Sequence, residues 1–193
     1  MSENLRLYTT ILFGFEHVLR SVPADAWENQ SPCEEWTTRQ VAGHAMGVVN
    51  NVAARGGVGA LVDAFGDVAS IAGADPVESF RQIRDRYLTA TDRRGALQTP
   101  VKSRLGEMTL DDYLGLMGSD LLVHTWDIAR AAGLDDTLDP GVVRLVYAGY
   151  VARDQETMRQ PDLYGAALEL GSADGTLNEQ DRLIAFTGRD PSR

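Results

Sequence analysis

Residues 109–133, TLDDYLGLMGSDLLVHTWDIARAAG, carry the pattern of one long helix. Thr109 is the expected N-cap and Gly133 the expected stop signal. Asp120 and His124 stand four residues apart within the apolar stripe of this helix. Four residues on a helix are one turn plus about 40°. The carboxylate and the imidazole therefore project from one face and can close on one ion.

The pattern is helical in most of the remaining chain as well. A short, loose helix is expected within 58–74, and extended segments are expected around 101–105 and 166–170. Helical spacing, capping residues and stop signals predict the main helices at 4–21, 37–55, 76–94, 110–132, 140–159 and 179–187. The expected architecture is all-α: a single domain over residues 1–193, built as an up-and-down four-helix bundle with additional short helices. Facing helices of such bundles often build metal sites in the core.

Composition narrows the function classes. The chain has 193 residues with 18 Lys and Arg against 28 Asp and Glu, which gives a net charge of −10. Nucleic acid and anionic membranes need a concentrated basic face, so neither is an expected partner. The start of the chain reads as a helix rather than a signal peptide, and the single cysteine, Cys33, favours a reducing cytoplasm. A small-molecule substrate is expected, and a homodimer is compatible with a bundle of this size.

His44 is the third residue of a candidate metal site. It lies in the apolar stripe of the helix expected at 37–55. A lone histidine on such a stripe is more often a hydrogen-bonded core residue, and Asp120 and His124 could simply pair with each other. Two histidines and a carboxylate that converge in an apolar interior can instead bind a divalent metal such as zinc, iron(II) or nickel. The residues leave both interpretations open.

Other polar and aromatic residues also have two possible roles each. Asp127 follows His124 by three residues and either orients that ligand or is a solvated charge. His17 borders its apolar stripe, which favours a surface or half-buried position. Cys33 is expected to be a turn residue rather than a nucleophile, and Trp36 and Trp126 are expected to fill the core. Candidate partners for an anionic substrate are Arg39, Arg55, Arg130 and Arg159.

Two segments together resemble a known superfamily. The pair SPCEEWTTRQVAGHAMG (31–47) and DLLVHTWDIARAAG (120–133) resembles the DinB-like metalloenzymes. The resemblance is closer to the N-terminal domain of mycothiol-dependent maleylpyruvate isomerases and related actinobacterial proteins. The ending DRLIAFTGRDP (181–191) is similar to the close of that actinobacterial subgroup.

This resemblance implies a four-helix bundle that holds a divalent metal, usually zinc, through His44, Asp120 and His124. The best-known isomerase of the family has Glu where this chain has Asp120. It also has a second, C-terminal domain that contributes to catalysis, and this chain is too short to include it. We therefore expect an activity related to maleylpyruvate isomerisation rather than that reaction itself.

Three protein ligands leave a coordination position open, as in catalytic rather than structural zinc sites. Such a position can hold a water as hydroxide for hydrolysis, or a thiol as thiolate. The resemblance favours the thiol, with mycothiol as cosubstrate for S-transfer to, or cis–trans isomerisation of, a small electrophile. The alternatives are a zinc metallohydrolase and a non-catalytic protein that binds a small molecule.

Overall fold

The computed structural model describes residues 1–33, 35–103, 105–153, 166–168 and 178–192. It divides into two compact units, Met1–Asp136 and Thr137–Arg193. The single domain expected over residues 1–193 stays a prediction.

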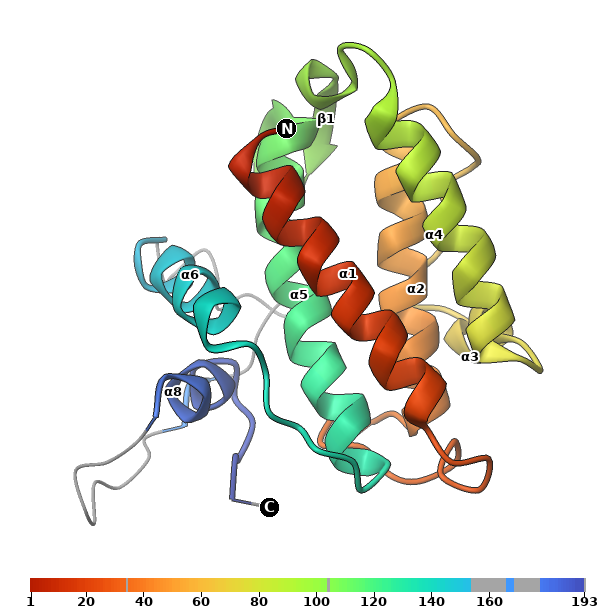
Figure 1. Ribbon diagram of the computed structural model, residues 1–193, viewed down its shortest axis with the longest axis vertical. Helices are drawn as coiled ribbons and strands as arrows, with labels where there is room; N and C mark the ends of the chain where they lie inside the picture. Colours follow the sequence, from red (N-terminus) through yellow and green to blue (C-terminus); the bar gives the residue numbers. More distant parts are fainter. Residues whose placement is uncertain (34, 104, 154–165, 169–177, 193) are drawn as a thin grey trace. The chain divides into compact units, whose positions relative to one another are not determined.

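The first unit is a bundle of four long helices. Figure 1 shows these helices side by side, with α1 against α5 and with α2 between α4 and α5. Their bounds are α1 Glu3–Ser21, α2 Thr38–Arg55, α4 Pro76–Asp92 and α5 Leu110–Ala131. The predicted helical bundle is thereby confirmed. Shorter elements complete the unit: α3 (Val68–Ala72), η1 (Ala96–Gln98), and the antiparallel pair β1 (Pro100–Ser103) and β2 (Gly106–Thr109).

Capping residues set the helix starts. The Thr37 hydroxyl accepts a hydrogen bond from the Gln40 N–H at 3.4 Å, and the Gln40 side chain accepts one from the Thr37 N–H at 2.9 Å. This reciprocal pair satisfies two N–H groups that the first turn leaves without helical partners. Thr109 caps α5 by accepting from the Asp112 N–H at 3.1 Å. Both N-caps were predicted from sequence and are confirmed, and they fix the register of the two helices that carry the candidate ligands.

Apolar and ionic contacts join α1 to α4. The Phe15 and Phe80 rings meet edge to face with centroids 4.9 Å apart. The Glu16 carboxylate, whose side chain is only 8% exposed, accepts hydrogen bonds from Arg84 Nη1 at 2.6 and 2.8 Å and from Arg20 Nη2 at 2.8 Å. Burial raises the pKa of Glu16, but the two guanidinium groups outweigh burial and lower it. Glu16 is thus a buried, ionised partner for both arginines.

The backbone of α3 lies directly on α2. A Cβ atom at Gly43 would stand 1.8 Å from the Val68 carbonyl oxygen and 2.7 Å from the Val68 carbonyl carbon. Only glycine allows this approach at position 43. The residue next to Gly43 is His44, so the close approach lies beside a candidate ligand.

The second unit contains α6 (Pro140–Val151) and α8 (Glu179–Phe186), which pack together with the Tyr150 and Phe186 rings 5.6 Å apart. Asn178 caps α8 as predicted. The helix expected to reach residue 159 ends at Val151, and residues 154–159 lie outside the described part. Residues 166–168 have no regular secondary structure, and the rest of the extended segment expected at 166–170 is not among the described residues.

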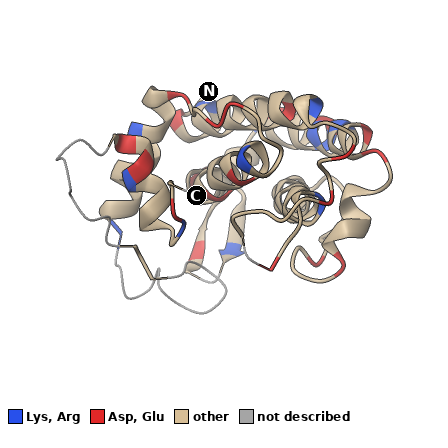
Figure 2. Cartoon of the chain, turned by 90° about the horizontal axis from the view of Figure 1, so that it is seen from below, with Lys and Arg blue, Asp and Glu red and all other residues tan. Residues whose placement is uncertain are grey.

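Charged residues of both signs are spread over the described part of the chain. Figure 2 shows Lys and Arg interspersed with Asp and Glu. No helix in the described part of the chain is both long enough and apolar enough to cross a membrane.

Candidate metal centre

The structure brings together the three candidate ligands predicted from sequence. His44 lies on α2 and is 3% exposed, while Asp120 and His124 lie one turn apart on α5, with His124 6% exposed. The His44 Nε2 atom is 3.7 Å from Asp120 Oδ2, and the His124 Nε2 atom is 3.6 Å from Asp120 Oδ1. One ligand atom from each residue lies within 4.8 Å of the other two. Two neighbouring helices of the bundle thus place two imidazoles around one carboxylate.

The opposite nitrogen of each imidazole is held by an oxygen acceptor. His44 Nδ1 donates a hydrogen bond to the Ala64 carbonyl at 2.6 Å. His124 Nδ1 donates to Asp127 Oδ2 at 2.8 Å, and Asp127 is fully buried. A carbonyl oxygen can only accept, so the His44 proton resides on Nδ1 and the neutral ring has its lone pair on Nε2. Metal-binding histidines are oriented by acceptors of this kind.

The loop after α2 places the Ala64 carbonyl. Asn50 Nδ2 donates to the Ala60 carbonyl at 2.8 Å. Asn51 binds Val62 twice, accepting from its N–H at 2.8 Å and donating to its carbonyl at 3.0 Å. These bonds fix the loop main chain just before Asp63 and Ala64, so the loop conformation there follows from amide side chains of the same helix that carries His44.

Charge couples the three residues. Burial raises the pKa of Asp120, but the imidazoles of His124 and His44 outweigh burial and hold it well below its usual range. Burial lowers the pKa of His124, but the Asp120 and Asp127 carboxylates outweigh burial and raise it to about 9. The cluster therefore favours a positive charge next to Asp120. A proton on His124 supplies one such charge, and a divalent cation would replace that proton.

The geometry bears on the two interpretations that the sequence left open. Simple pairing would place imidazole nitrogen and carboxylate oxygen about 2.7–3.2 Å apart. The separations of 3.6 and 3.7 Å are longer, and the buried Asp120 Oδ2 has no hydrogen-bond partner among the described residues. Ligand atoms about 2.0–2.1 Å from a tetrahedral ion stand roughly 3.3 Å from one another. The spacing of the three side chains is thus compatible with a shared ion.

Aromatic rings lie against the histidines. The Trp36 ring centroid is 4.7 Å from that of His44 and 6.3 Å from that of His124. The Phe65 ring, from the loop after α2, is 4.8 Å from His44 and is 54% exposed. Trp36 was expected to fill the core; instead it is half-buried and covers the site, because the turn before Thr37 directs it towards both histidines. Phe65 was missed, since nothing in the loop sequence marks it.

The remaining sequence candidates lie elsewhere or play structural parts. His17 is exposed, as predicted, and Trp126 is buried in the core. Cys33 belongs to a turn, where its N–H bonds Ser31 Oγ at 3.1 Å and its carbonyl accepts from Trp36 N–H at 2.8 Å.

The candidate arginines have partners of their own. Arg39 binds Glu28 at 2.8 Å, and the Arg55 guanidinium lies 5.0 Å from the Tyr113 ring centre. Arg130 binds Asp136 at 2.9 Å. Arg159 lies outside the described residues.

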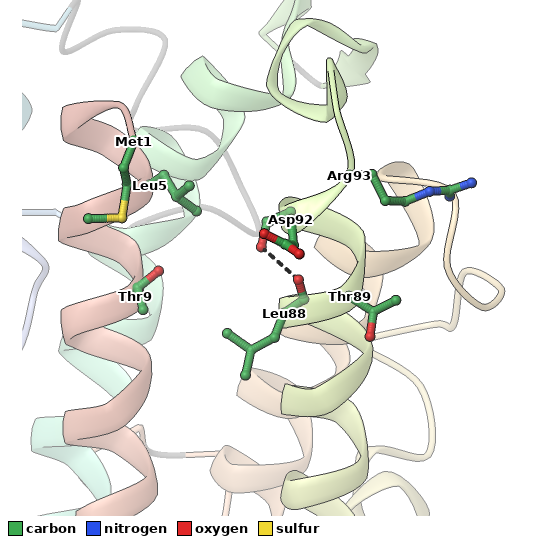
Figure 3. Close-up of a pocket in the computed structure, with 8 residues that line it drawn as sticks. Met1, Leu5, Thr9, Leu88, Thr89, Asp92 and Arg93 are labelled. Atoms are coloured by element: carbon green, nitrogen blue, oxygen red, sulfur yellow. Dashed lines mark hydrogen bonds between the residues drawn. The ribbon is translucent and has the colours of Figure 1, made fainter.

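A surface groove lies between the start of α1 and the end of α4 (Figure 3). In Figure 3, Leu5 and Thr9 of α1 face Leu88 and Asp92 of α4. None of the three candidate ligands lines this groove. Among the residues described, this groove has no cluster of titratable side chains comparable to the one on α2 and α5. The histidine–aspartate cluster is therefore the candidate functional site.

Comparison with known proteins agrees with this fold. Residues 14–129 match the family described as mycothiol maleylpyruvate isomerase N-terminal domain. Two uncharacterised proteins from strains of Mycobacterium tuberculosis are each 28% identical over 185 residues, which covers 91% of this chain and 92% of theirs. A crystal structure of a histidine-to-alanine mutant of the mycothiol-dependent maleylpyruvate isomerase has a TM-score of 0.58 at 16% identity, covering 78% of this chain and 67% of that chain. The predicted resemblance is confirmed.

Proposed function

The chain belongs to the mycothiol maleylpyruvate isomerase N-terminal domain family, and from this membership we propose a mycothiol-linked enzyme, either an isomerase or a thiol transferase. We further propose that it works through one divalent metal ion, held by His44, Asp120 and His124. The substrate class that follows is a small electrophile, on which a thiol adds or to which it is transferred.

One observation carries this proposal. Both histidines direct Nε2 towards the same carboxylate while Nδ1 is occupied by Ala64 in one case and Asp127 in the other. Histidines that serve only to pack the core need not direct their Nε2 atoms towards one carboxylate. The arrangement is instead that of imidazoles fixed in tautomer and orientation for an ion.

The donor set indicates which ion and which chemistry. Two imidazoles and a carboxylate suit zinc, and also iron(II) or nickel. A divalent ion with three protein ligands retains an open position and holds a thiol as thiolate at neutral pH. In this chain Asp127 keeps the His124 ring in place through its hydrogen bond. Trp36 and Phe65 cover the ring of His44 with apolar surface and thereby limit access of water to the site.

The test is metal analysis of freshly purified protein. Wild type and His17→Ala should each contain about one equivalent of zinc or a related divalent metal, because His17 is an exposed histidine away from the site. His124→Ala should lose most of it, because the site then has two ligands. Equal metal content in His124→Ala and wild type, with helical content preserved by circular dichroism, would contradict the metal site.

Activity separates the thiol enzyme from a hydrolase. Conversion of small electrophiles related to maleylpyruvate should require both mycothiol and the metal. Conversion that proceeds at the same rate without any thiol would instead indicate a metal-dependent hydrolase and would overturn the thiol-linked proposal.

A further inference from the structure

The loop after α2 exposes a group of large apolar side chains next to the candidate metal centre. Leu61, Val62 and Phe65 are 61%, 38% and 54% exposed. Single exposed apolar residues are ordinary on a protein surface, but grouped ones mark binding sites. Phe65 connects this group to the centre, because its ring centroid is 4.8 Å from that of His44. The apolar loop therefore meets a candidate ligand at Phe65.

Hydrogen bonds hold Phe65 in place. The Ala64 carbonyl accepts from His44 Nδ1 at 2.6 Å, and Asp63 Oδ1 accepts from the Phe65 N–H at 2.9 Å. The main chain is thus fixed at Phe65 and at the residue before it. The exposed part of the ring is therefore an apolar surface with a defined position beside His44.

Trp36 supplies a second aromatic surface at the same place. Its ring centroid is 4.7 Å from that of His44 and 6.3 Å from that of His124, and the residue is half-buried. These separations are those of aromatic rings in contact. The Asp120 side chain is 22% exposed, so the cluster reaches the surface at its carboxylate. A molecule that reaches the three candidate ligands would therefore lie next to histidines that pack against Trp36 and Phe65.

The charges of the chain favour an uncharged group at this surface. The net charge is −10, which disfavours a highly anionic substrate. Arg39 binds the Glu28 carboxylate at 2.8 Å. Arg130 binds the Asp136 carboxylate at 2.9 Å. Small-molecule sites are mostly lined by apolar and aromatic side chains with a few polar groups, and the surface next to His44 has this composition.

We propose that the rings of Phe65 and Trp36 bind a planar, apolar substituent of the electrophilic substrate, and that Phe65 determines specificity for it. The inference rests on the proposed function and narrows its substrate class to electrophiles that carry an aromatic or conjugated group. The substituent packs against the two rings while the rest of the substrate reaches the candidate ligands. Aromatic groups gain from such packing beyond the apolar area that they bury.

Two metal-chelating probes test this assignment. Benzohydroxamate and acetohydroxamate bind a metal ion through the same hydroxamate group and differ in a phenyl against a methyl substituent. The affinity of the Co²⁺-loaded protein for each probe is measured from the change in its visible spectrum. The ratio of the two affinities, compared between variants, reports the contact with the substituent and requires no turnover.

The variants are Phe65→Ala and Phe65→Tyr, with Leu61→Ala as the matched control. Leu61 lies on the same loop and is also exposed, but its neighbour Ala60 is bound by Asn50. Asn50 is six residues beyond His44, which is about 9 Å along α2. Leu61→Ala therefore removes a comparable apolar side chain from a more distant part of the loop.

Phe65→Ala should lower the ratio of benzohydroxamate to acetohydroxamate affinity about 3- to 10-fold, because one aromatic contact is lost. Its affinities for Co²⁺ and for acetohydroxamate should equal those of wild type. Phe65→Tyr keeps the ring and should keep the ratio, and Leu61→Ala should keep it as well.

The contrary outcomes differ in reach. A wild-type ratio in Phe65→Ala would show that Phe65 does not contact the substituent. An equal loss of affinity for both probes would show that Phe65 supports the metal site without contacting the substituent. Either result overturns the inference and leaves the metal site standing, whereas failure of the wild-type protein to bind Co²⁺ would remove the metal-dependent function together with it.

Discussion

The variant Gly43→Ala tests whether the backbone of α3 packs on α2 as closely as the structure shows. The added Cβ would stand 1.8 Å from the Val68 carbonyl oxygen. Carbon–oxygen contacts are normally about 3.3 Å, so the backbone of α3 must retreat by about 1.5 Å. Overpacking costs about 1–3 kcal/mol, and a clash with main chain belongs at the upper end because no rotamer relieves it. Alanine regains about 1 kcal/mol of helix propensity, which leaves a net loss of about 2 kcal/mol.

Thermal unfolding of the metal-free protein measures this loss. A decrease of 2 kcal/mol in a protein of this size lowers Tm by about 4–8 °C. Gly14→Ala is the matched control, because Gly14 is an exposed position inside α1 where a Cβ would meet nothing within 4 Å. That variant should be about 0.5–1 kcal/mol more stable than wild type. Gly43→Ala should also bind zinc more weakly, since α3 follows the loop that orients His44.

The opposite result is easy to recognise. If Gly43→Ala raised Tm as Gly14→Ala does, α3 would not lie against α2 in solution as it does in the structure. The account of why glycine precedes His44 would then fail.

Three further changes probe separate parts of the chain. Asp127→Asn should weaken zinc binding about 10- to 100-fold in a competition titration, because His124 loses a charged acceptor; unchanged affinity would show that Asp127 does not orient the ligand. Glu16→Gln should lower the free energy of unfolding by about 2 kcal/mol at pH 7, as charged hydrogen bonds are lost. The folded-state pKa of Glu16 lies below its ordinary value of 4.5, so this advantage of wild type is complete above pH 4.5 and disappears as the pH falls through the folded-state pKa. Urea unfolding across that range checks it, and a difference that stays constant down to acid pH would refute the ion pair. Thr37→Ala should cost about 1 kcal/mol by chemical denaturation, because the capping box with Gln40 is lost, whereas an unchanged midpoint would assign the start of α2 to packing alone.

The helix starts were predictable because capping is local chemistry. Thr37 with Gln40, Thr109, and Asn178 each satisfy N–H groups within three residues, so the signal is present in the sequence itself. The end of α6 was not predictable in this way. Helix-compatible residues follow Val151, and no glycine or proline marks the stop.

The site was predictable only in part, for a related reason. The four-residue spacing of Asp120 and His124 fixes their common face, and His44 was placed with them by its apolar stripe and by the family resemblance. The orienting contacts of His44 were beyond sequence reasoning, because Ala64 and Phe65 reach it through a loop whose course depends on amide side chains some ten residues away.

The Ala64 carbonyl has an evolutionary consequence. Every amino acid carries a main-chain carbonyl, so no change of side-chain chemistry at position 64 removes the acceptor that orients His44. The residue's size is limited, because a Cβ at Gly47 would already be 3.0 Å from the Ala64 Cβ. An insertion or deletion between residues 58 and 66, by contrast, would shift the acceptor out of reach. Related sequences can therefore tolerate amino-acid substitutions in this segment more readily than changes in its length. A change in length there would mark a lineage in which the ion chemistry has been lost or rebuilt.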